Sequence, residues 1–169
     1  KKIDAARAAW AQSDNSAGTL LKMRPELLGF DKTLRQINTL SPQLLALSEE
    51  LAAQKLARGA SAKEMAAVGR MMMLTQRLAR SATEFLTSGV VRPETAFQLG
   101  RDTATFRATV DGFVNGSAAL GIAATQDADL RAKLAEIKTQ FDLYEAAVAA
   151  ILDNLPKFSA ARAAEQSIF

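Results

Sequence analysis

The chain has 169 residues, a formal net charge of +3, and neither cysteine nor histidine. Without these two residues it cannot form a Ser-His-Asp or Cys-His nucleophile, and it cannot bind zinc through thiolates and imidazoles. Its 34 alanines and 21 leucines favour long helices, because both side chains lose little conformational freedom in a helix.

Apolar residues recur at alternating steps of three and four along most of the chain, which predicts an all-α fold. Such sustained spacing is typical of helices that pack at shallow angles in coiled coils and long bundles. We therefore predict an elongated helical bundle of the four-helix-bundle type, with an extra or broken N-terminal helix. Residues 1–169 are predicted to form one module, and the pattern leaves five or six helices possible.

The first expected helix covers residues 3–20 and is only weakly apolar in its middle. The next stretch, residues 21–31, is the least regular part of the chain because it contains Pro25 and Gly29. We expect a broken connection or a short extra helix there. Apolar spacing resumes over residues 40–54, which predicts the second helix.

A proline at residue 42 either starts this second helix or kinks a helix that runs through it. The third expected helix covers residues 65–86. Ser61 and Glu64 have the spacing of a capping box, in which each side chain accepts a hydrogen bond from the other residue's backbone N–H. Gly89 is predicted to end this helix in the left-handed conformation.

The fourth expected helix covers residues 99–120, with Pro93 in its first turn and Gly121 at its end. The Asn-Gly-Ser sequence at residues 115–117 is poor helical material, so we expect it to mark a kink or a close approach of a neighbouring helix.

The fifth expected helix covers residues 130–155 and has the most regular apolar spacing in the chain. Asp127 or Asp129 is placed to cap its first turn, and Pro156 is predicted to kink or interrupt its last turns.

Met71, Met72 and Met73 stand in a row on the third expected helix. A methionine run could suggest a soft copper site. Successive helical residues point about 100° apart, however, so the three thioethers cannot converge on one ion. We expect flexible core packing plus one exposed methionine, and we predict neither a metal ion nor a cofactor.

Arg70 and Arg77 lie seven residues apart, so they share one face of the same helix. They could clamp an anion through charge-assisted hydrogen bonds. Alternatively, they belong to a solvated face with modest ion pairing, which the spacing alone favours.

Four acids, Asp102, Asp111, Asp142 and Glu145, have the spacing of ordinary helix-surface residues. No two of them stand out as the paired carboxylates that glycoside hydrolysis requires. We therefore predict that the protein is not an enzyme. The mild positive charge, without a dense basic stripe or stacking aromatics, also argues against nucleic-acid binding.

The segment from Ala67 to Ala79 resembles a helix motif of the PilJ family, the N-terminal sensory region of type IV pilus methyl-accepting transducers. That motif reads approximately A-G-R-Q-R-M-L-S-Q-R. The matching residues are Gly69, Arg70, Met73, Leu74, Gln76 and Arg77, with Thr75 in place of serine. Residues 97–102, 115–122 and 164–169 also look like that family, so the resemblance is clearest from about residue 60 to residue 169.

The resemblance implies a periplasmic helical bundle in an inner-membrane chemoreceptor that controls twitching motility, with signals passed across the membrane by helix displacement. It also implies a homodimer, with a pilin subunit or another protein as a possible ligand. The expected ligand- or partner-binding residues are Arg70, Thr75, Gln76 and Arg77, and the expected structural residues of the motif are Gly69, Met72 and Met73.

Nitrate sensors share a related motif, in which an arginine three positions after the glycine clamps the anion. That position here is Met72. Because a thioether cannot supply the donors that an anion requires, we predict that nitrate is not bound at this position.

The chain begins at Lys1 and ends at Phe169, and both ends read as helical. We therefore expect a piece of a longer membrane receptor. The alternative is a structural or interaction protein, such as a phasin-like coat or scaffold, which would suit the same composition. An apolar membrane segment directly after Phe169 in the full gene would favour the receptor.

Overall fold

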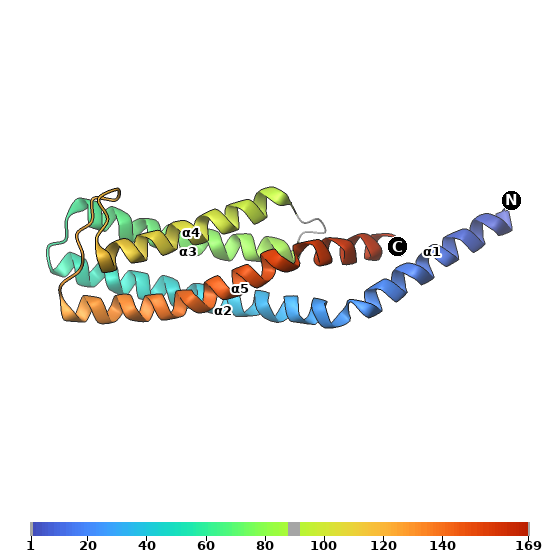
Figure 1. The fold of residues 1–169 in the computed structure, drawn as a ribbon, viewed down its shortest axis with the longest axis horizontal. Coiled ribbons are helices and arrows are strands. Elements are labelled where there is room, and N and C mark those ends of the chain that lie inside the picture. Colours follow the sequence, from blue (N-terminus) through green and yellow to red (C-terminus); the bar gives the residue numbers. More distant parts are fainter. Residues whose placement is uncertain (1, 88–91, 169) are drawn as a thin grey trace.

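The computed structural model describes residues 2–87 and 92–168. Within these ranges it contains no strand and five helices: α1 (Lys2–Lys22), α2 (Arg24–Ala57), α3 (Ala62–Thr87), α4 (Pro93–Asn115) and α5 (Ala128–Gln166). Helices α2 to α5 form an antiparallel bundle in which each helix packs against the next and α5 packs against α2 (Figure 1). The prediction of an all-α elongated bundle is confirmed. Gly89, the predicted end of α3, lies outside the described residues.

Helices α1 and α2 are almost continuous, with one break at Met23. The Met23 amide donates to the Thr19 carbonyl at 3.1 Å, and the Met23 carbonyl accepts from the Leu27 amide at 3.0 Å. The break predicted within residues 21–31 is thus found at the single residue Met23, but the rest of this stretch is helical and no separate short helix forms there. Pro25 lies in the first turn of α2, where a missing N–H removes no helical hydrogen bond, so the proline starts this helix.

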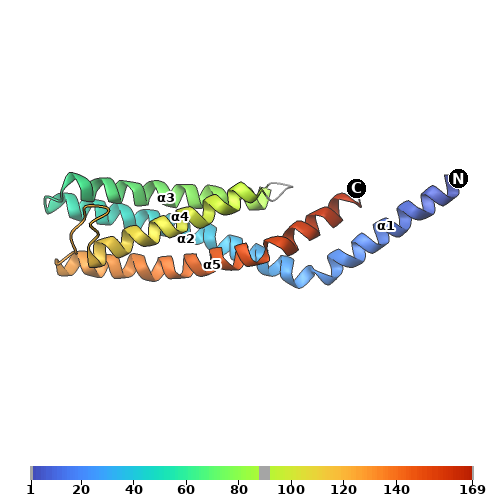
Figure 2. The same cartoon turned by 45° about the horizontal axis from the view of Figure 1, so that its top comes forward.

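Two prolines lie inside helices, Pro42 in α2 and Pro156 in α5. Of the two predicted roles of Pro42, the observed one is a position within a helix that runs through it. Next to it, the Ser41 hydroxyl donates to the Ile37 carbonyl at 2.8 Å. Helix α5 is not interrupted at Pro156 but continues to Gln166, and its ribbon bends in this part (Figure 2).

Side chains cap two of the helices as the sequence predicts. In the capping box of α3, the Glu64 amide donates to Ser61 Oγ at 3.3 Å, and the Ser61 amide donates to Glu64 Oε2 at 2.9 Å. At the start of α5 the capping residue is Asp127, whose carboxylate accepts from the Leu130 amide at 3.0 Å. Pro93 lies in the first turn of α4, also as predicted.

Helix α4 ends at Asn115, five residues before the predicted end at residue 120. Gly116 has φ +85° and ψ 152°, a conformation that is open essentially only to glycine. Ser117 and Ile122 then exchange backbone hydrogen bonds of 2.8 and 3.0 Å around a tight turn. The Asn-Gly-Ser sequence therefore ends α4, and the prediction that it lies within the helix is wrong.

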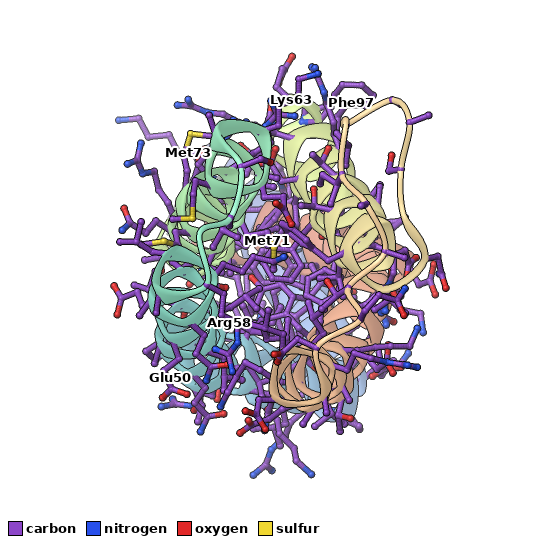
Figure 3. All side chains as sticks on the ribbon, turned by 90° about the vertical axis from the view of Figure 1, so that its left-hand side faces the viewer. Glu50, Arg58, Lys63, Met71, Met73 and Phe97 are labelled. Carbon is purple, nitrogen blue, oxygen red and sulfur yellow. The ribbon has the colours of Figure 1, made fainter. Side chains whose placement is uncertain are left out.

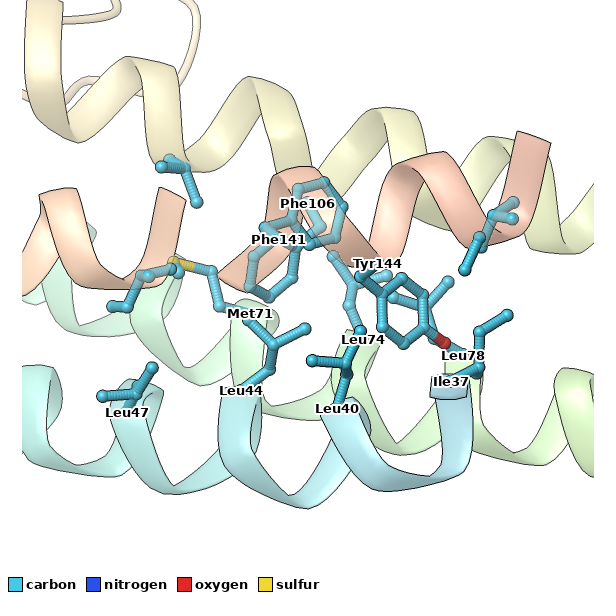
Figure 4. Close-up of a cluster of buried hydrophobic side chains, with 14 of the residues drawn as sticks. Ile37, Leu40, Leu44, Leu47, Met71, Leu74, Leu78, Phe106, Phe141 and Tyr144 are labelled. Carbon is cyan, nitrogen blue, oxygen red and sulfur yellow. The ribbon is translucent and has the colours of Figure 1, made fainter. Parts of the chain in front are cut away.

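The core runs along the inside of the four-helix bundle. In its middle the Phe106 and Phe141 rings stack with centroids 4.3 Å apart, and Tyr144 stacks on Phe141 at 5.9 Å (Figure 4). Around these rings pack residues from α2 and α3 at the predicted spacing of three and four, namely Ile37, Leu40, Leu44, Leu47, Met71, Leu74 and Leu78. Long helices with aliphatic stripes thus close around one aromatic centre.

Both ends of the described chain lie at the same pole, which we call the proximal pole (Figures 1 and 2). The opposite pole, the distal tip, contains the turn between α2 and α3 and the connection between α4 and α5. Helix α1 extends past the bundle at the proximal pole and has no buried residue. Its Ser16 hydroxyl lies 2.5 Å from the hydroxyl of Ser167, just after α5.

Candidate binding surface on α3

The motif from Gly69 to Arg77 occupies the middle of α3 and presents different residues to three different surroundings. Met71 is fully buried in the core, Met72 packs partly against it, and Met73 is 48% exposed. Seen from the distal tip, Met71 lies inside the bundle and Met73 projects outward (Figure 3). The prediction of core packing plus one exposed methionine is confirmed.

Arg70 faces the connection between α4 and α5. With Lys63, which lies on the same side of α3 toward the tip, it lines a surface depression of about 310 Å³ that is closed on the other side by residues 118–121. Both cations are exposed and no acidic side chain lines this depression. Arg70 is therefore available for a partner. Gly69 beside it is also exposed, and no atom of a neighbouring element lies within 4 Å of the place that a Cβ would take there.

Thr75 and Gln76 face α2 instead. Together with Ala79 they line a shallow groove of about 220 Å³ against the α2 residues Asn38, Ser41, Pro42 and Leu45. Thr75 is buried, and its hydroxyl donates to the Met72 carbonyl at 2.7 Å. Gln76 is exposed. Of these two predicted binding residues, only Gln76 offers its polar group to solvent.

Arg77 is held by α4. Its Nη2 lies 3.0 Å from Asp102 Oδ1, and the same oxygen accepts from Gln98 Nε2 at 2.6 Å. The Asp102 side chain is 4% exposed, so the interpretation of this acid as a surface residue is wrong. A guanidinium already paired with a buried carboxylate is a poor clamp for a free anion, because the clamp would leave that carboxylate uncompensated.

The second oxygen of Asp102, Oδ2, is buried and has no hydrogen-bond partner among the described residues. Sequence reasoning missed this site, although a signal existed. Asp102 lies three residues after Leu99 and four before Phe106, so it falls on the apolar stripe of α4. An acid on such a stripe predicts a buried ion pair, because an unpaired buried charge is very costly.

The other three acids are surface residues that join α4 to α5. Asp142 and Glu145 both accept hydrogen bonds from Arg107, and Asp111 lies 3.7 Å from Lys138. Partial burial lowers the pKa of Arg107, but the hydrogen bonds to Glu145 and Asp142 outweigh it and the net shift is upward. These contacts are structural ion pairs between two helices.

The motif helix and its bundle match a known family. The family model described as the N-terminal region of the type IV pili methyl-accepting chemotaxis transducer, PilJ, matches residues 57–166. The chain belongs to the PilJ family. The match begins at the end of α2 and includes all of α3, α4 and α5, so the motif residues Arg70 to Arg77 lie within it.

Two curated proteins are similar to nearly the whole chain. The putative methyl-accepting chemotaxis protein AlkN of Alcanivorax borkumensis is 28% identical over 161 residues, which are 95% of this chain and 24% of AlkN. Protein PilJ of Pseudomonas aeruginosa is 26% identical over 168 residues, which are 99% of this chain and 25% of that protein. The chain thus spans about a quarter of the length of these relatives.

None of the described helices has a stretch both long and apolar enough to cross a membrane.

Proposed function

We propose that this PilJ-type domain is the extracytoplasmic sensory part of a membrane-anchored chemoreceptor that controls type IV pilus motility. In this proposal the domain is periplasmic and non-enzymatic, and it acts as a homodimer. It detects a partner or ligand on the bundle and reports it by moving helices at the proximal pole. The family membership favours this role over a coat or scaffold protein.

The observation that carries the proposal is the course of α5. This helix of 39 residues starts at the distal tip, passes the aromatic centre and ends at the proximal pole. At 1.5 Å per residue it is about 58 Å long. Because it packs against α2 and α4 along the way, a change at the tip or on the bundle face can shift its far end.

The movement is proposed to occur between α5 and α1 at the proximal pole. Apart from its last turns, α1 is exposed, so few contacts oppose a sliding of one helix past the other. The contact between Ser16 and Ser167 joins the two segments there, with 2.5 Å between their hydroxyl oxygens. A covalent bond at this contact would prevent sliding without changing the rest of the bundle.

The test is a receptor that carries Ser16→Cys and Ser167→Cys in its full-length form. The chain has no native cysteine, so only one intramolecular disulfide can form within this domain. We expect the oxidised receptor to lose the stimulus dependence of twitching and to regain it after reduction. Each single variant is the control, because it changes the same side chains without a link between the helices.

If the oxidised double variant responds like the single variants, the proposed displacement between α1 and α5 is wrong. Formation of the disulfide is checked by a mobility shift on non-reducing gels, so an unlinked receptor is not mistaken for an insensitive one.

The surface around α3 is the proposed docking site for a protein partner, and a pilin subunit is the first partner to test. Arg70 and Gln76 are the exposed members of the predicted set, whereas Thr75 and Arg77 support the surface from within. We expect Arg70→Ala with Gln76→Ala to weaken the binding of purified pilin to this chain in a pull-down. The exposed residues Arg131 and Thr139 on α5 provide the matched control pair.

A further inference from the structure

A second site lies at the distal tip, away from the motif on α3. A cavity of about 460 Å³ opens between the ends of three helices. Its walls are the last turn of α2 with the turn that follows it, the first turn of α3, the first turn of α5, and residues 123–127 before α5. Every helix end at this pole except that of α4 thus contributes to one cavity.

A buried cation lines the cavity, the ammonium of Lys55, whose side chain is only 4% exposed. Its Nζ donates to Glu64 Oε1 at 2.8 Å and lies 4.7 Å from the centroid of the Phe113 ring. An ammonium has three N–H donors. The Glu64 hydrogen bond uses one of them, and within the described ranges no second acceptor contacts Lys55.

A second polar group in the wall also lacks a partner. Thr125 is 8% exposed, and its hydroxyl has no hydrogen-bond partner among the residues that the structure describes. Its backbone is held in place, because the Thr125 amide donates to the Phe113 carbonyl at 2.9 Å. Thr125 and Lys55 line the same cavity, and a ligand with acceptor oxygens would supply the hydrogen bond that the buried Thr125 hydroxyl lacks.

Charge balance narrows the class of ligand. The cavity is lined by two cations, Lys55 and Arg58, and by two acids, Glu64 and Asp127. They already form pairs, with Arg58 Nε 3.0 Å from Asp127 Oδ2, and Arg58 lies toward the middle of the bundle end (Figure 3). A simple anion that replaced Glu64 as the partner of Lys55 would leave the Glu64 carboxylate without a cation. A molecule with both a carboxylate and an ammonium can replace both members of a pair and leave no charge uncompensated.

The rest of the wall is small and apolar. Ala60, Ala123, Ala124 and Leu130 line the cavity between the charged groups. A charged side chain on the ligand would find no partner in this apolar part of the wall. We propose that this cavity binds a free α-amino acid with a small uncharged side chain, its carboxylate on Lys55 and Thr125 and its ammonium on Glu64 and Asp127.

The proposal deepens the proposed sensory function, because the cavity includes the first turn of α5, the helix taken to carry the signal. The ligand test itself needs no signalling. Purified chain is titrated with each standard L-amino acid while its melting temperature, Tm, is measured. Sodium acetate and methylammonium chloride serve as the separated halves of the ligand. Selective binding to the folded state raises the Tm with the logarithm of ligand concentration above Kd.

We expect glycine, alanine or serine to raise the Tm in a saturable way that neither acetate nor methylammonium reproduces at equal concentration. Thr125→Val and Lys55→Met should weaken this binding about tenfold or more, since each removes a hydrogen bond to a charged group. The matched controls are Thr109→Val and Lys133→Met. Thr109 is a buried threonine and Lys133 an ion-paired lysine, and neither lines the cavity.

Three outcomes would overturn the proposal: no Tm shift with any amino acid, an equal shift with acetate alone, or a shift that survives Thr125→Val. Because Thr125→Val keeps the shape of the side chain, it tests the site even if Lys55→Met fails to fold. Amino-acid binding together with a normal response of the disulfide-linked receptor would refute the helix displacement and leave the tip site intact.

Discussion

The buried carboxylate of Asp102 joins α4 to α3 through its ion pair with Arg77. The side chain of its partner Arg77 is 40% exposed, so this ion pair is more buried than a surface salt bridge but less buried than one with both partners in the core. Exposed pairs contribute up to about 1 kcal/mol, and loss of one partner from a buried pair costs about 3–5 kcal/mol. The loss of unfolding free energy on removal of Arg77 should therefore lie between these two limits.

We expect Arg77→Ala to lower the free energy of unfolding by about 1–3 kcal/mol, because it leaves a buried carboxylate without its cation. In urea denaturation, Arg80→Ala is the control, since this exposed arginine joins no ion pair among the described residues and should change stability by less than about 0.5 kcal/mol. Adding Asp102→Asn to Arg77→Ala should recover part of the loss. Strict additivity of the two variants would contradict the pairing.

Tyr144, the only tyrosine, makes the stability of the bundle sensitive to alkaline pH. Its ring is buried, and this burial raises the pKa of its hydroxyl above the ordinary value, although the Ser41 side chain opposes the shift. Above a pH of about 10 the unfolded chain loses this proton while the folded chain keeps it. Stability then falls by about 1.4 kcal/mol per pH unit until the folded pKa is reached.

Tyr144→Phe should remove this contribution, so the difference in unfolding free energy between the variant and the native chain should grow above a pH of about 10 and be constant below it. Tyrosinate absorbance is a second readout, because it should appear together with unfolding. Ionisation of Tyr144 in a chain that is still folded at that pH would contradict the prediction.

The apolar periodicity of the sequence predicts the faces of the helices better than it predicts the interactions of the polar residues on those faces. It predicted that the three methionines face different sides and that one is exposed, but not which one, because three consecutive residues on a helix must point in different directions. It missed Asp102 because an acid was assumed to lie on the surface. Only the fold shows that Arg77 of the neighbouring helix lies within 3.0 Å of that acid, a contact between residues 25 positions apart.

At the scale of elements, the end of α4 shows where extrapolated spacing fails. Leu120 keeps the apolar spacing of the helix and still packs against the core, although the backbone has left the helix after Asn115. A tight turn can thus place a side chain where a further helical turn would have placed it. The signal for the true end was Gly116, because glycine is common just after the last residue of a helix.

Changing Gly116 or Gly69 to alanine should have opposite effects on the free energy of unfolding. Gly116→Ala forces an L-residue into φ +85°, and the new Cβ would lie 3.2 Å from the Ala124 amide nitrogen. We expect a loss of about 1–3 kcal/mol in chemical denaturation. Gly69→Ala is the matched control within α3, where no neighbouring element lies within 4 Å of the new Cβ. It should stabilise the chain by about 0.5–1 kcal/mol. Equal effects of both substitutions would contradict the assigned end of α4.

At the scale of the whole molecule, the sequence predicted a bundle but left open whether five or six helices form. The described residues form five helices, and the chain ends share a pole because α1 and α2 run in the same direction almost without a break (Figure 1). Pro25 lies in the first turn of α2 and so marks a helix boundary, whereas Pro42 is tolerated inside α2 and adds no helix. Such tolerance depends on packing and on local hydrogen bonds such as that of Ser41, which a propensity argument cannot assess.

Helix α1 provides the last prediction, because it leaves apolar side chains uncovered. Ile3 and Trp10 are 69% and 76% exposed, and helices in proteins owe most of their stability to packing of their apolar face. The proposed homodimer would supply the missing contact. Deletion of residues 1–12 should therefore leave the Tm of the dilute chain unchanged while it weakens dimerisation in sedimentation equilibrium. Trp10, the only tryptophan, should shift its fluorescence emission to shorter wavelength as the concentration of the intact chain rises. Dimers that survive the deletion would place the interface elsewhere on the bundle.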